Sequence, residues 1–294
     1  MEWKQRFLDR YKGLTDIEKF IEYSERPLRK SIRVNTIKTS VREMKARFDL
    51  KPIPWCDVGF FVEGKAIGNT HEHFLGYIYL QEAVSMIPPV VLNPGKDDCV
   101  LDMCASPGSK STQIAAMMDN KGILVANDNA ISRLKPLSMN LQRCGVSNVV
   151  MTLMEGRWFK TDFDRILVDA PCSGIGTIRK SPKTVSWWNP NFIKQMAGIQ
   201  KQLLDTAFKI LRPGGVLVYS TCTLEPEEDE GVVDSLIRNH DDAKLQKISL
   251  DIKSSPCILE FEGNVYDPEI KKCLRLWPQD NDTEGFFVAK IKKS

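Results

Sequence analysis

The chain has 294 residues, of which 42% are hydrophobic and 27% are charged, with a formal net charge of +3. This composition excludes a predominantly disordered chain, and the length suits about two domains. No apolar run reaches the ~18 residues of a membrane-spanning helix, and the first residues lack the apolar stretch of a secretion signal. The eight cysteines include no C-x-x-C pair, so we expect free thiols in a reducing cytoplasm, without a disulfide framework or a metal site.

The charge is unevenly distributed, and one basic stretch lies near the N-terminus. Between residues 26 and 51, nine basic residues accompany only Glu43 and Asp49. The nine are Arg26, Arg29, Lys30, Arg33, Lys38, Arg42, Lys45, Arg47 and Lys51. The stretch is either a solvated face or an electrostatic surface for a phosphate backbone. We expect residues 1–90 to form a small α/β region around it, and residues 91–294 to form a second domain.

From about residue 98 onward, short apolar runs alternate with segments of helical periodicity. Strands are predicted at 99–103, 123–128, 148–151, 166–169 and 215–220, and helices at 111–118, 131–144 and 192–211. Apolar runs at 258–261 and 285–291 would complete the sheet. The alternation predicts an α/β fold: a doubly wound, mostly parallel, seven-stranded sheet with helices on both faces. Ligands of such folds bind at the carboxyl ends of the strands.

The segment after the first predicted strand has the composition of a ligand-binding loop. Its residues are Cys104, Ala105, Ser106, Pro107, Gly108, Ser109 and Lys110. Small side chains let a ligand approach the backbone, and the N–H groups of the following helix would face it. A tight turn without a ligand is the alternative. The phosphate-binding patterns G-x-G-x-x-G and G-x-x-x-x-G-K-[ST] are absent, which disfavours NAD and ATP.

Carboxylates follow the next two predicted strands. Asp128, 26 residues beyond Asp102, is placed to accept hydrogen bonds from ribose hydroxyls, although aspartate is also a common helix N-cap. Glu155 follows the third strand and either meets an adenine amino group or stays solvated. A nucleoside cofactor without a phosphate requirement fits this combination, which indicates S-adenosylmethionine.

Two cysteines, Cys172 and Cys222, follow the fourth and fifth predicted strands. A lone buried cysteine usually acts as a small apolar residue, but two thiols at neighbouring strand ends beside a cofactor loop suggest chemistry. A thiolate that adds to carbon 6 of cytosine activates carbon 5 toward a methyl donor. Asp169 is placed to bind the N3/N4 edge of the base, and Lys110 to stabilise the thiolate. The base must leave its stack to reach them, and the residues alone do not rank the two thiols.

Two further charged segments have competing interpretations. After Cys172 come Arg179, Lys180, Lys183, Trp187 and Trp188. They either hold an RNA strand by phosphate contact and stacking, or pack on the following helix. After Cys222 comes the acidic run 225–230, whose Pro226 and acids are typical of the first turn of a helix.

Four blocks of the sequence resemble the Sun-type RNA (cytosine-5) methyltransferases, a family that uses S-adenosylmethionine. The blocks are 101–110, 125–128 with Arg133, 169–174 and 220–228. Shorter similarities at 32–36, 54–56, 79–83 and 284–289 extend the resemblance over nearly the whole chain. The chain departs from the family at Ser109, where glycine is usual, and at Glu155, where aspartate is usual.

The resemblance implies a Rossmann-like methyltransferase domain at 91–294 and an RNA-binding region at 1–90. The cofactor site would be lined by Cys104, Ala105, Ser106, Pro107, Gly108, Ser109, Lys110, Asp128, Arg133, Glu155 and Asp169. Lys110 and Asp169 would also face the base. The family chooses Cys222 as the nucleophile and gives Cys172 a part in releasing the methylated product.

We therefore expect a cytoplasmic, monomeric enzyme that methylates carbon 5 of cytosine in structured RNA, with tRNA preferred to rRNA. An rRNA enzyme is the nearest alternative. A non-catalytic RNA-binding or ribosome-assembly factor on the same fold is the alternative from another class. An N-methyltransferase is disfavoured, because the fourth strand ends in Asp169-Ala-Pro-Cys172 rather than in a Pro-Pro-aromatic motif.

Overall fold

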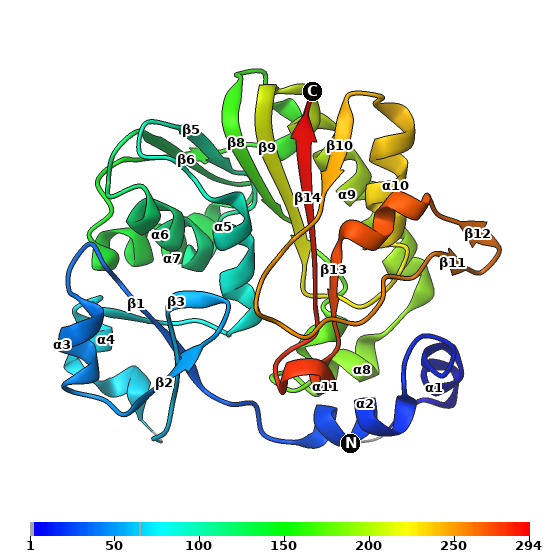
Figure 1. Ribbon diagram of the computed structural model, residues 1–294, viewed down its shortest axis with the longest axis horizontal. Helices are drawn as coiled ribbons and strands as arrows, with labels where there is room; N and C mark the ends of the chain where they lie inside the picture. The colour runs from blue at the N-terminus through cyan, green and yellow to red at the C-terminus, as the bar shows by residue number, and fades with distance from the viewer. Residues whose placement is uncertain (1–2, 65) are drawn as a thin grey trace.

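The computed structural model describes residues 3–64 and 66–294. Met1, Glu2 and Lys65, which belong to the predicted N-terminal region, lie outside the described residues. The chain folds into a large mixed sheet flanked by helices, with a smaller antiparallel sheet beside it (Figure 1). No helix of the described part is long and apolar enough to cross a membrane.

The large sheet has eight strands in the order β10-β14-β9-β8-β5-β6-β7, with β13 paired to β14 outside this path. Their bounds are β5 Cys99–Asp102, β6 Ile123–Asp128, β7 Val149–Leu153, β8 Phe163–Asp169, β9 Leu211–Thr221, β10 Ala243–Gln246, β13 Leu274–Leu276 and β14 Phe286–Lys293. Strands β5 to β9 pair in parallel, whereas β14 is antiparallel to β9, β10 and β13. The predicted mostly parallel sheet is confirmed; six of the seven expected strands belong to it, and β10 and β13, which were not predicted, bring it to eight.

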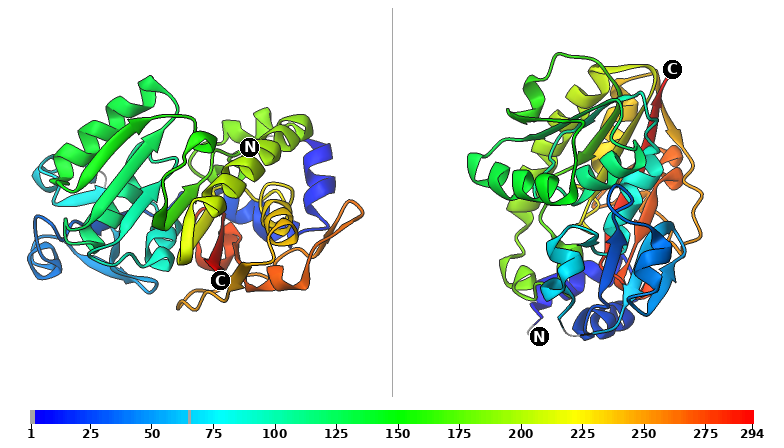
Figure 2. Two further views of the ribbon diagram at one scale, coloured as in Figure 1. Left: turned by 90° about the horizontal axis from the view of Figure 1, so that it is seen from above. Right: turned by 90° about the vertical axis from the view of Figure 1, so that its left-hand side faces the viewer.

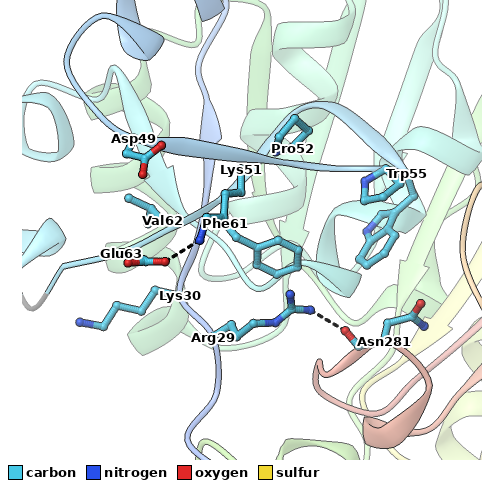
Figure 3. Close-up of a pocket in the computed structure, with 11 residues that line it drawn as sticks. Arg29, Lys30, Asp49, Lys51, Pro52, Trp55, Phe61, Val62, Glu63 and Asn281 are labelled. Atoms are coloured by element: carbon cyan, nitrogen blue, oxygen red, sulfur yellow. Dashed lines mark hydrogen bonds and ion pairs between the residues drawn. The ribbon is translucent and has the colours of Figure 1, made fainter.

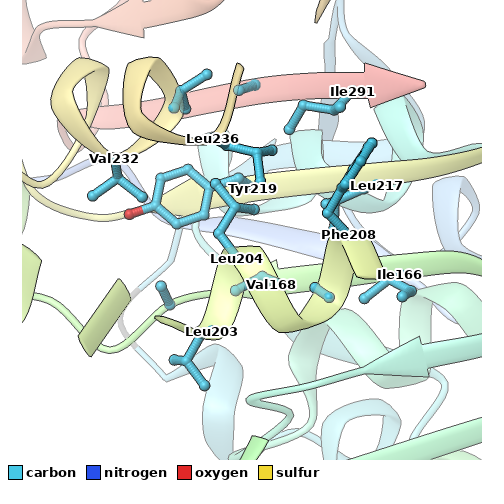
Figure 4. Close-up of a cluster of buried hydrophobic side chains, with 14 of the residues drawn as sticks. Ile166, Val168, Leu203, Leu204, Phe208, Leu217, Tyr219, Val232, Leu236 and Ile291 are labelled. Atoms are coloured by element: carbon cyan, nitrogen blue, oxygen red, sulfur yellow. The ribbon is translucent and has the colours of Figure 1, made fainter. Parts of the chain in front are cut away.

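Helices cover both faces of this sheet (Figure 2). Their bounds are α5 Ile87–Leu92, α6 Ser109–Met117, α7 Ile131–Cys144, α9 Pro190–Lys209 and α10 Glu230–Asn239. Because side chains alternate along a strand, Ile166 and Val168 of β8 join the core beneath α9 and α10, whereas Leu167 joins the core beneath α5 and α6. Figure 4 shows the first of these cores, with Leu204 and Phe208 of α9 packed on the sheet.

The prediction that residues 258–261 complete the sheet is wrong. Glu260–Phe261 forms β11, which pairs only with β12, Asn264–Val265, in a separate hairpin. Glu262 and Gly263 both have positive φ, of 46° and 79°, as a tight two-residue hairpin requires. The two strands of the hairpin pair with each other, and β10 lies beside β14 instead.

The N-terminal part contains a second, four-stranded antiparallel sheet in the order β2-β3-β1-β4. Its strands are β1 Ser31–Val34, β2 Leu50–Ile53, β3 Cys56–Val62 and β4 Ile78–Leu80. Short helices connect them: α3 Val41–Lys45 between β1 and β2, and η1 Ile67–Asn69 and α4 His71–Phe74 between β3 and β4; η2 Val84–Met86 follows β4. The expected small α/β region is therefore present. Its own core includes Ile32, Phe60 and Ile78, all almost fully buried.

The first two helices pack away from this small sheet. Helices α1 (Gln5–Tyr11) and α2 (Ile17–Glu25) lie at the opposite end of the molecule from the C-terminus (Figure 1). Their Phe7, Tyr11 and Phe20 join a buried cluster with Trp188 and Trp277 of the larger domain. This cluster also takes in side chains of the short elements η4 Ile175–Thr177 and α8 Lys183–Trp187. The remaining short elements are η3 Gly156–Trp158, η5 Pro268–Lys272 and α11 Pro278–Asn281.

Candidate active site

The carboxyl ends of β5, β6, β8 and β9 meet at one edge of the sheet, where two cavities lie. The first cavity has a volume of about 370 Å³. Its lining residues are Met103, Cys104, Ser106, Asn127, Asp128, Asn129, Arg133, Glu155, Gly156, Asp169, Ala170, Pro171, Cys172, Ile199, Leu203 and Cys222. The structure thus brings together residues that the sequence places after five different strands.

One wall of the first cavity is a fixed polar corner at the end of β6. The buried Asp128 carboxylate accepts from Arg133 Nε at 3.0 Å and from Ser106 N at 3.3 Å, both through Oδ2. Arg133 also donates to the Ser106 carbonyl, and the Ser106 hydroxyl donates to the Arg133 carbonyl. Since both bonds of the carboxylate end on Oδ2, Oδ1 remains an acceptor for a ligand. Glu155 lies on the same cavity wall and accepts from Asn129 Nδ2 at 3.3 Å.

The second cavity, of about 350 Å³, lies on the other side of the loop after β5. Its predicted members are Cys104, Ala105, Ser106, Pro107, Ser109, Lys110, Asp169 and Cys222. The loop is therefore divided: only Cys104 and Ser106 line both cavities, while Ala105, Pro107, Ser109 and Lys110 face the second. Gly108 lines neither cavity and serves as the N-cap of α6, with a positive φ of 102°.

A charged pair stands where the two cavities meet. Lys110 Nζ donates to Asp169 Oδ2 at 2.7 Å, and the Ser220 hydroxyl donates to Asp169 Oδ1 at 2.7 Å. Burial by itself lowers the pKa of Lys110, but the Asp169 carboxylate outweighs burial and raises it above its usual value. Lys110 is therefore a permanent cation, only 8% exposed, on the wall of the second cavity.

The two predicted thiols lie next to each other, with 3.3 Å between their sulfur atoms. The contact with Cys222, together with burial, raises the pKa of Cys172, which keeps this thiol protonated. Cys222 lines both cavities, whereas Cys172 lines only the first. The two thiols consequently have different access: Cys172 faces a ligand in the first cavity alone, whereas Cys222 faces both cavities.

Buried carboxylates hold the segments that carry the thiols. Glu228 accepts from Ser173 N at 3.0 Å and from Gln200 Nε2 at 2.7 Å, which fixes the turn of Cys172.

The interpretation of 225–230 as the first turn of a helix holds only for Glu230, because α10 begins there. Glu225, Glu228 and Asp229 precede the helix and are fully buried. Sequence pattern missed this because burial depends on partners, such as Arg275, that lie far away in the chain.

Several cavity residues were not predicted. The first cavity also uses Asn127, Asn129 and Leu203, and the second uses Glu284 and Phe286. Asn127 and Asn129 flank Asp128, so a wider window around that strand end would have included them. Glu284 and Phe286 belong to the similarity at 284–289. They lie before and at the start of the antiparallel β14, so the rule that ligands bind at the carboxyl ends of parallel strands does not predict them.

Some of the basic and aromatic residues considered for RNA binding are buried, and others lie at the surface. Arg33 is buried and donates to Gln81, Ser109 and Thr112, and Arg179 is buried against the carbonyls of Pro27 and Thr283. Trp188 is also buried, so these three are structural. The rest of the basic stretch includes residues that remain at the surface, where a third cavity of about 580 Å³ is lined by Arg29, Lys30 and Lys51 over Phe61 and Trp55 (Figure 3).

No cluster of three or more His, Cys, Asp or Glu side chains that could hold a metal ion is present among the described residues. The first cavity fits the nucleoside cofactor suggested by the sequence. It offers an acceptor oxygen on Asp128, an amide and a carboxylate at Asn129 and Glu155, and apolar walls at Ile199 and Leu203. These are the groups that a ribose, an adenine edge and an adenine face require.

Comparison with known proteins identifies the family. Residues 89–292 match the family model of the 16S rRNA methyltransferase RsmB/F, and residues 4–83 match that of the N-terminal domain of 16S rRNA methyltransferase RsmF. The chain is 45% identical to the tRNA (cytosine(49)-C(5))-methyltransferase of Pyrococcus abyssi, over 100% of this chain and 99% of the relative. It is also 45% identical to the ribosomal RNA small subunit methyltransferase F of Aliivibrio fischeri, but it spans only 60% of that relative's length.

Solved structures agree with these matches. A methyltransferase homologue from Pyrococcus horikoshii superposes with a TM-score of 0.89 at 38% identity, covering 99% of this chain and 96% of the other. NSun6 from Pyrococcus horikoshii, solved with SFG, superposes with a TM-score of 0.86 at 26% identity, covering 99% and 98% of the two chains. The Rossmann-like methyltransferase fold and the family resemblance are both confirmed. The chain belongs to the RsmB/F family of RNA cytosine-5 methyltransferases.

Proposed function

We propose that this chain transfers a methyl group from S-adenosylmethionine to carbon 5 of a cytosine in tRNA, through a covalent bond between Cys222 and carbon 6. The observation that carries the proposal is the meeting of the two cavities at Asp169 and Cys222. A cofactor in the first cavity and a base in the second would both reach these two residues. The preference for tRNA over rRNA is supported by the relative from Pyrococcus abyssi, which matches over its whole length.

The first cavity would hold the cofactor. Asp128 would accept hydrogen bonds from the ribose, with Arg133 and Ser106 keeping its carboxylate in place. Glu155 and Asn129 would meet the adenine edge, and Ile199 and Leu203 its face. S-adenosylmethionine would supply an electrophilic methyl group there, and the SFG in the NSun6 structure, an analogue of it, supports this choice.

The second cavity would hold the flipped-out cytosine. Cys222 forms the bond to carbon 6, and the electron pair of the 5,6 double bond becomes available at carbon 5 for the bond to the methyl carbon. Lys110 stabilises the thiolate electrostatically, and Asp169 binds the polar edge of the ring. A base then removes the carbon 5 proton, and the electron pair of that C–H bond restores the 5,6 double bond as the bond between carbon 6 and the Cys222 sulfur breaks.

Cys172 would assist the last step. Its protonated thiol, 3.3 Å from the Cys222 sulfur, is placed to donate a hydrogen bond to that sulfur as it leaves carbon 6. A leaving thiolate is more stable when it accepts a hydrogen bond, so product release is faster. Access supports this division of roles, because of the two thiols Cys172 and Cys222 only Cys222 lines the second cavity.

The N-terminal region, proposed as residues 1–90, would hold the RNA. Arg42 and Lys45 are exposed on α3, and the cavity at Arg29, Lys30 and Lys51 lies on the same small sheet (Figure 3). Phosphate contacts by such side chains make binding depend on salt. We further propose that the protein is a monomer in the cytoplasm, and we expect a single 33.4 kDa species in solution.

The test is covalent trapping. Cys172→Ala is incubated with S-adenosylmethionine and unfractionated small RNA, and a denaturing gel is searched for a protein–RNA band. We expect a band that the double substitution with Cys222→Ala abolishes, and tRNA as the trapped RNA on sequencing. Trapped rRNA would replace the proposed substrate, and persistence of the band without Cys222 would reverse the roles of the thiols. Absence of methylation with any RNA would favour a non-catalytic RNA-binding factor.

A further inference from the structure

Glu284 lies two residues before β14, on the wall of the second cavity, with no assigned role. Its side chain is 6% exposed, and its Oε1 has no hydrogen-bond partner among the described residues. A buried polar atom without a partner is costly, so it usually marks a place where another group binds. The cavity that it lines also contains Lys110, Asp169 and Cys222.

The protonation of Glu284 follows from its neighbours. Burial and the nearby Glu82 raise the pKa of Glu284 to about 8, against the opposing effect of Lys180, Lys110 and Arg179. The Glu82 carboxylate accepts from the backbone N–H groups of Val84, Ser85 and Glu284, at 2.7, 3.2 and 3.2 Å, and these bonds favour its charged form. At neutral pH Glu284 therefore carries a proton, and its carboxyl group has one donor and one acceptor.

The position of Glu284 relative to the nucleophile is fixed by the backbone. Gly285 N donates to the Gly176 carbonyl at 2.9 Å, and Gly176 N donates to the Cys222 carbonyl at 2.9 Å. The three segments approach so closely that a Cβ on Gly176 would lie 2.2 Å from the Gly285 oxygen. The backbone therefore holds Glu284 and Cys222 in a fixed relative position, and a residue that recognises the base attacked by Cys222 needs such a position.

We propose that Glu284 recognises the target base: its carboxyl O–H donates a hydrogen bond to N3 of cytosine, while Asp169 accepts from the 4-amino group. The inference rests on the proposed function. Uracil presents an N3–H and a 4-oxygen at the same places, so the Glu284 O–H would lose its acceptor and the Asp169 carboxylate would lose its donor. The same hydrogen bond withdraws electron density from the ring and favours addition of Cys222 at carbon 6.

The test pairs a substitution with a change in the base. Glu284→Leu is compared with wild type on RNA whose target is cytosine or 3-deazacytosine, in which a C–H group replaces N3. With cytosine we expect a loss of kcat/KM of about ten- to hundredfold, as for a lost buried hydrogen bond. With 3-deazacytosine the substitution should cost less than about twofold, because the wild type has no acceptor there either.

A second variant separates recognition from folding. Glu284→Gln keeps a donor at all pH values, so we expect kcat/KM within about threefold of wild type at pH 7. Wild-type activity should fall above about pH 8, as Glu284 loses its proton, and the Gln variant should lack this fall. Glu260→Gln, exposed on β11 and outside both cavities, is the matched control and should behave as wild type.

Three results would overturn the inference. They are unchanged kcat/KM in Glu284→Leu, an equal loss with both bases, and the same alkaline fall in Glu284→Gln as in wild type. Thermal unfolding and cofactor affinity are measured for each variant, since a variant that fails to fold loses both. If wild type methylates no cytosine in any RNA, the proposed function fails, and this outcome is distinct from the three above.

Discussion

Arg275 is fully buried, and its guanidinium group joins two buried carboxylates to the segment that carries Cys222. It donates to Glu230 at 2.7 and 2.5 Å, to Asp229 at 3.1 Å and to the Leu224 carbonyl at 3.1 Å. Asp229 in turn accepts from the Thr221 hydroxyl at 2.5 Å. Replacing Arg275 with methionine would fill most of its volume but leave both carboxylates without a counter-charge.

The expected loss is large. Removal of one partner from a buried ion pair costs about 3–5 kcal/mol, because the remaining charge is desolvated and unpaired. An unfolding entropy of ~2.1 cal/mol/K per residue gives ~0.6 kcal/mol/K for a chain of this length, so Tm should fall by about 5–8 °C. Thermal unfolding followed by circular dichroism measures it, and kcat should fall as well, since the 221–224 segment loses its anchor.

The control is Arg238→Met, which removes an exposed partner of Asp234 one helix turn away in α10. Exposed pairs contribute little, so Tm should stay within about 1 °C of wild type. Adding Glu230→Gln to Arg275→Met should recover part of the loss, because one buried charge disappears. Equal Tm values for Arg275→Met and Arg238→Met would refute the reasoning that Arg275 compensates buried carboxylates.

Three further predictions concern the site and the RNA-binding region. Gly176→Ala should lower Tm and abolish methylation, because its Cβ would lie 2.2 Å from the Gly285 oxygen. Gly198→Ala is the control: this glycine lies in α9 with open space around it, so alanine should stabilise the protein by about 0.5–1 kcal/mol. Thermal unfolding and a methylation assay measure both variants. Lys110→Met should reduce kcat at least ~100-fold while cofactor affinity in the first cavity is retained, and equal losses of both would contradict its placement. Replacing Arg42 and Lys45 with alanine should lower the slope of log Kd against log salt by about 2 for tRNA, without a change in Tm. An unchanged slope would mean that these two residues do not contact RNA phosphates.

Local sequence pattern determined which segments form most strands of the large sheet and which principal site residues stand at their ends. Apolar runs with intervening helical periodicity predicted β5, β6, β7, β8 and β9, and in a parallel sheet their carboxyl ends must share one edge. Asp128, Asp169 and Cys222 could therefore be assigned to one site before any contact was known. The bounds of α7, at Ile131–Cys144, were also predicted from helical periodicity, and the structure shows Gly145 ending this helix in the left-handed conformation.

The tertiary structure decided what depends on partners distant in the chain. The sequence determined which residues stand at the strand ends, but only the fold divides the loop 104–110 between two cavities and gives Cys222 access to both. It likewise buries Arg33 and Arg179, which pattern alone leaves as surface cations, and buries Glu225 and Glu228 beside their partners. The physical reason is that periodicity reports which face of an element is apolar, whereas burial of a charge depends on the hydrogen bonds and counter-charges that other elements supply.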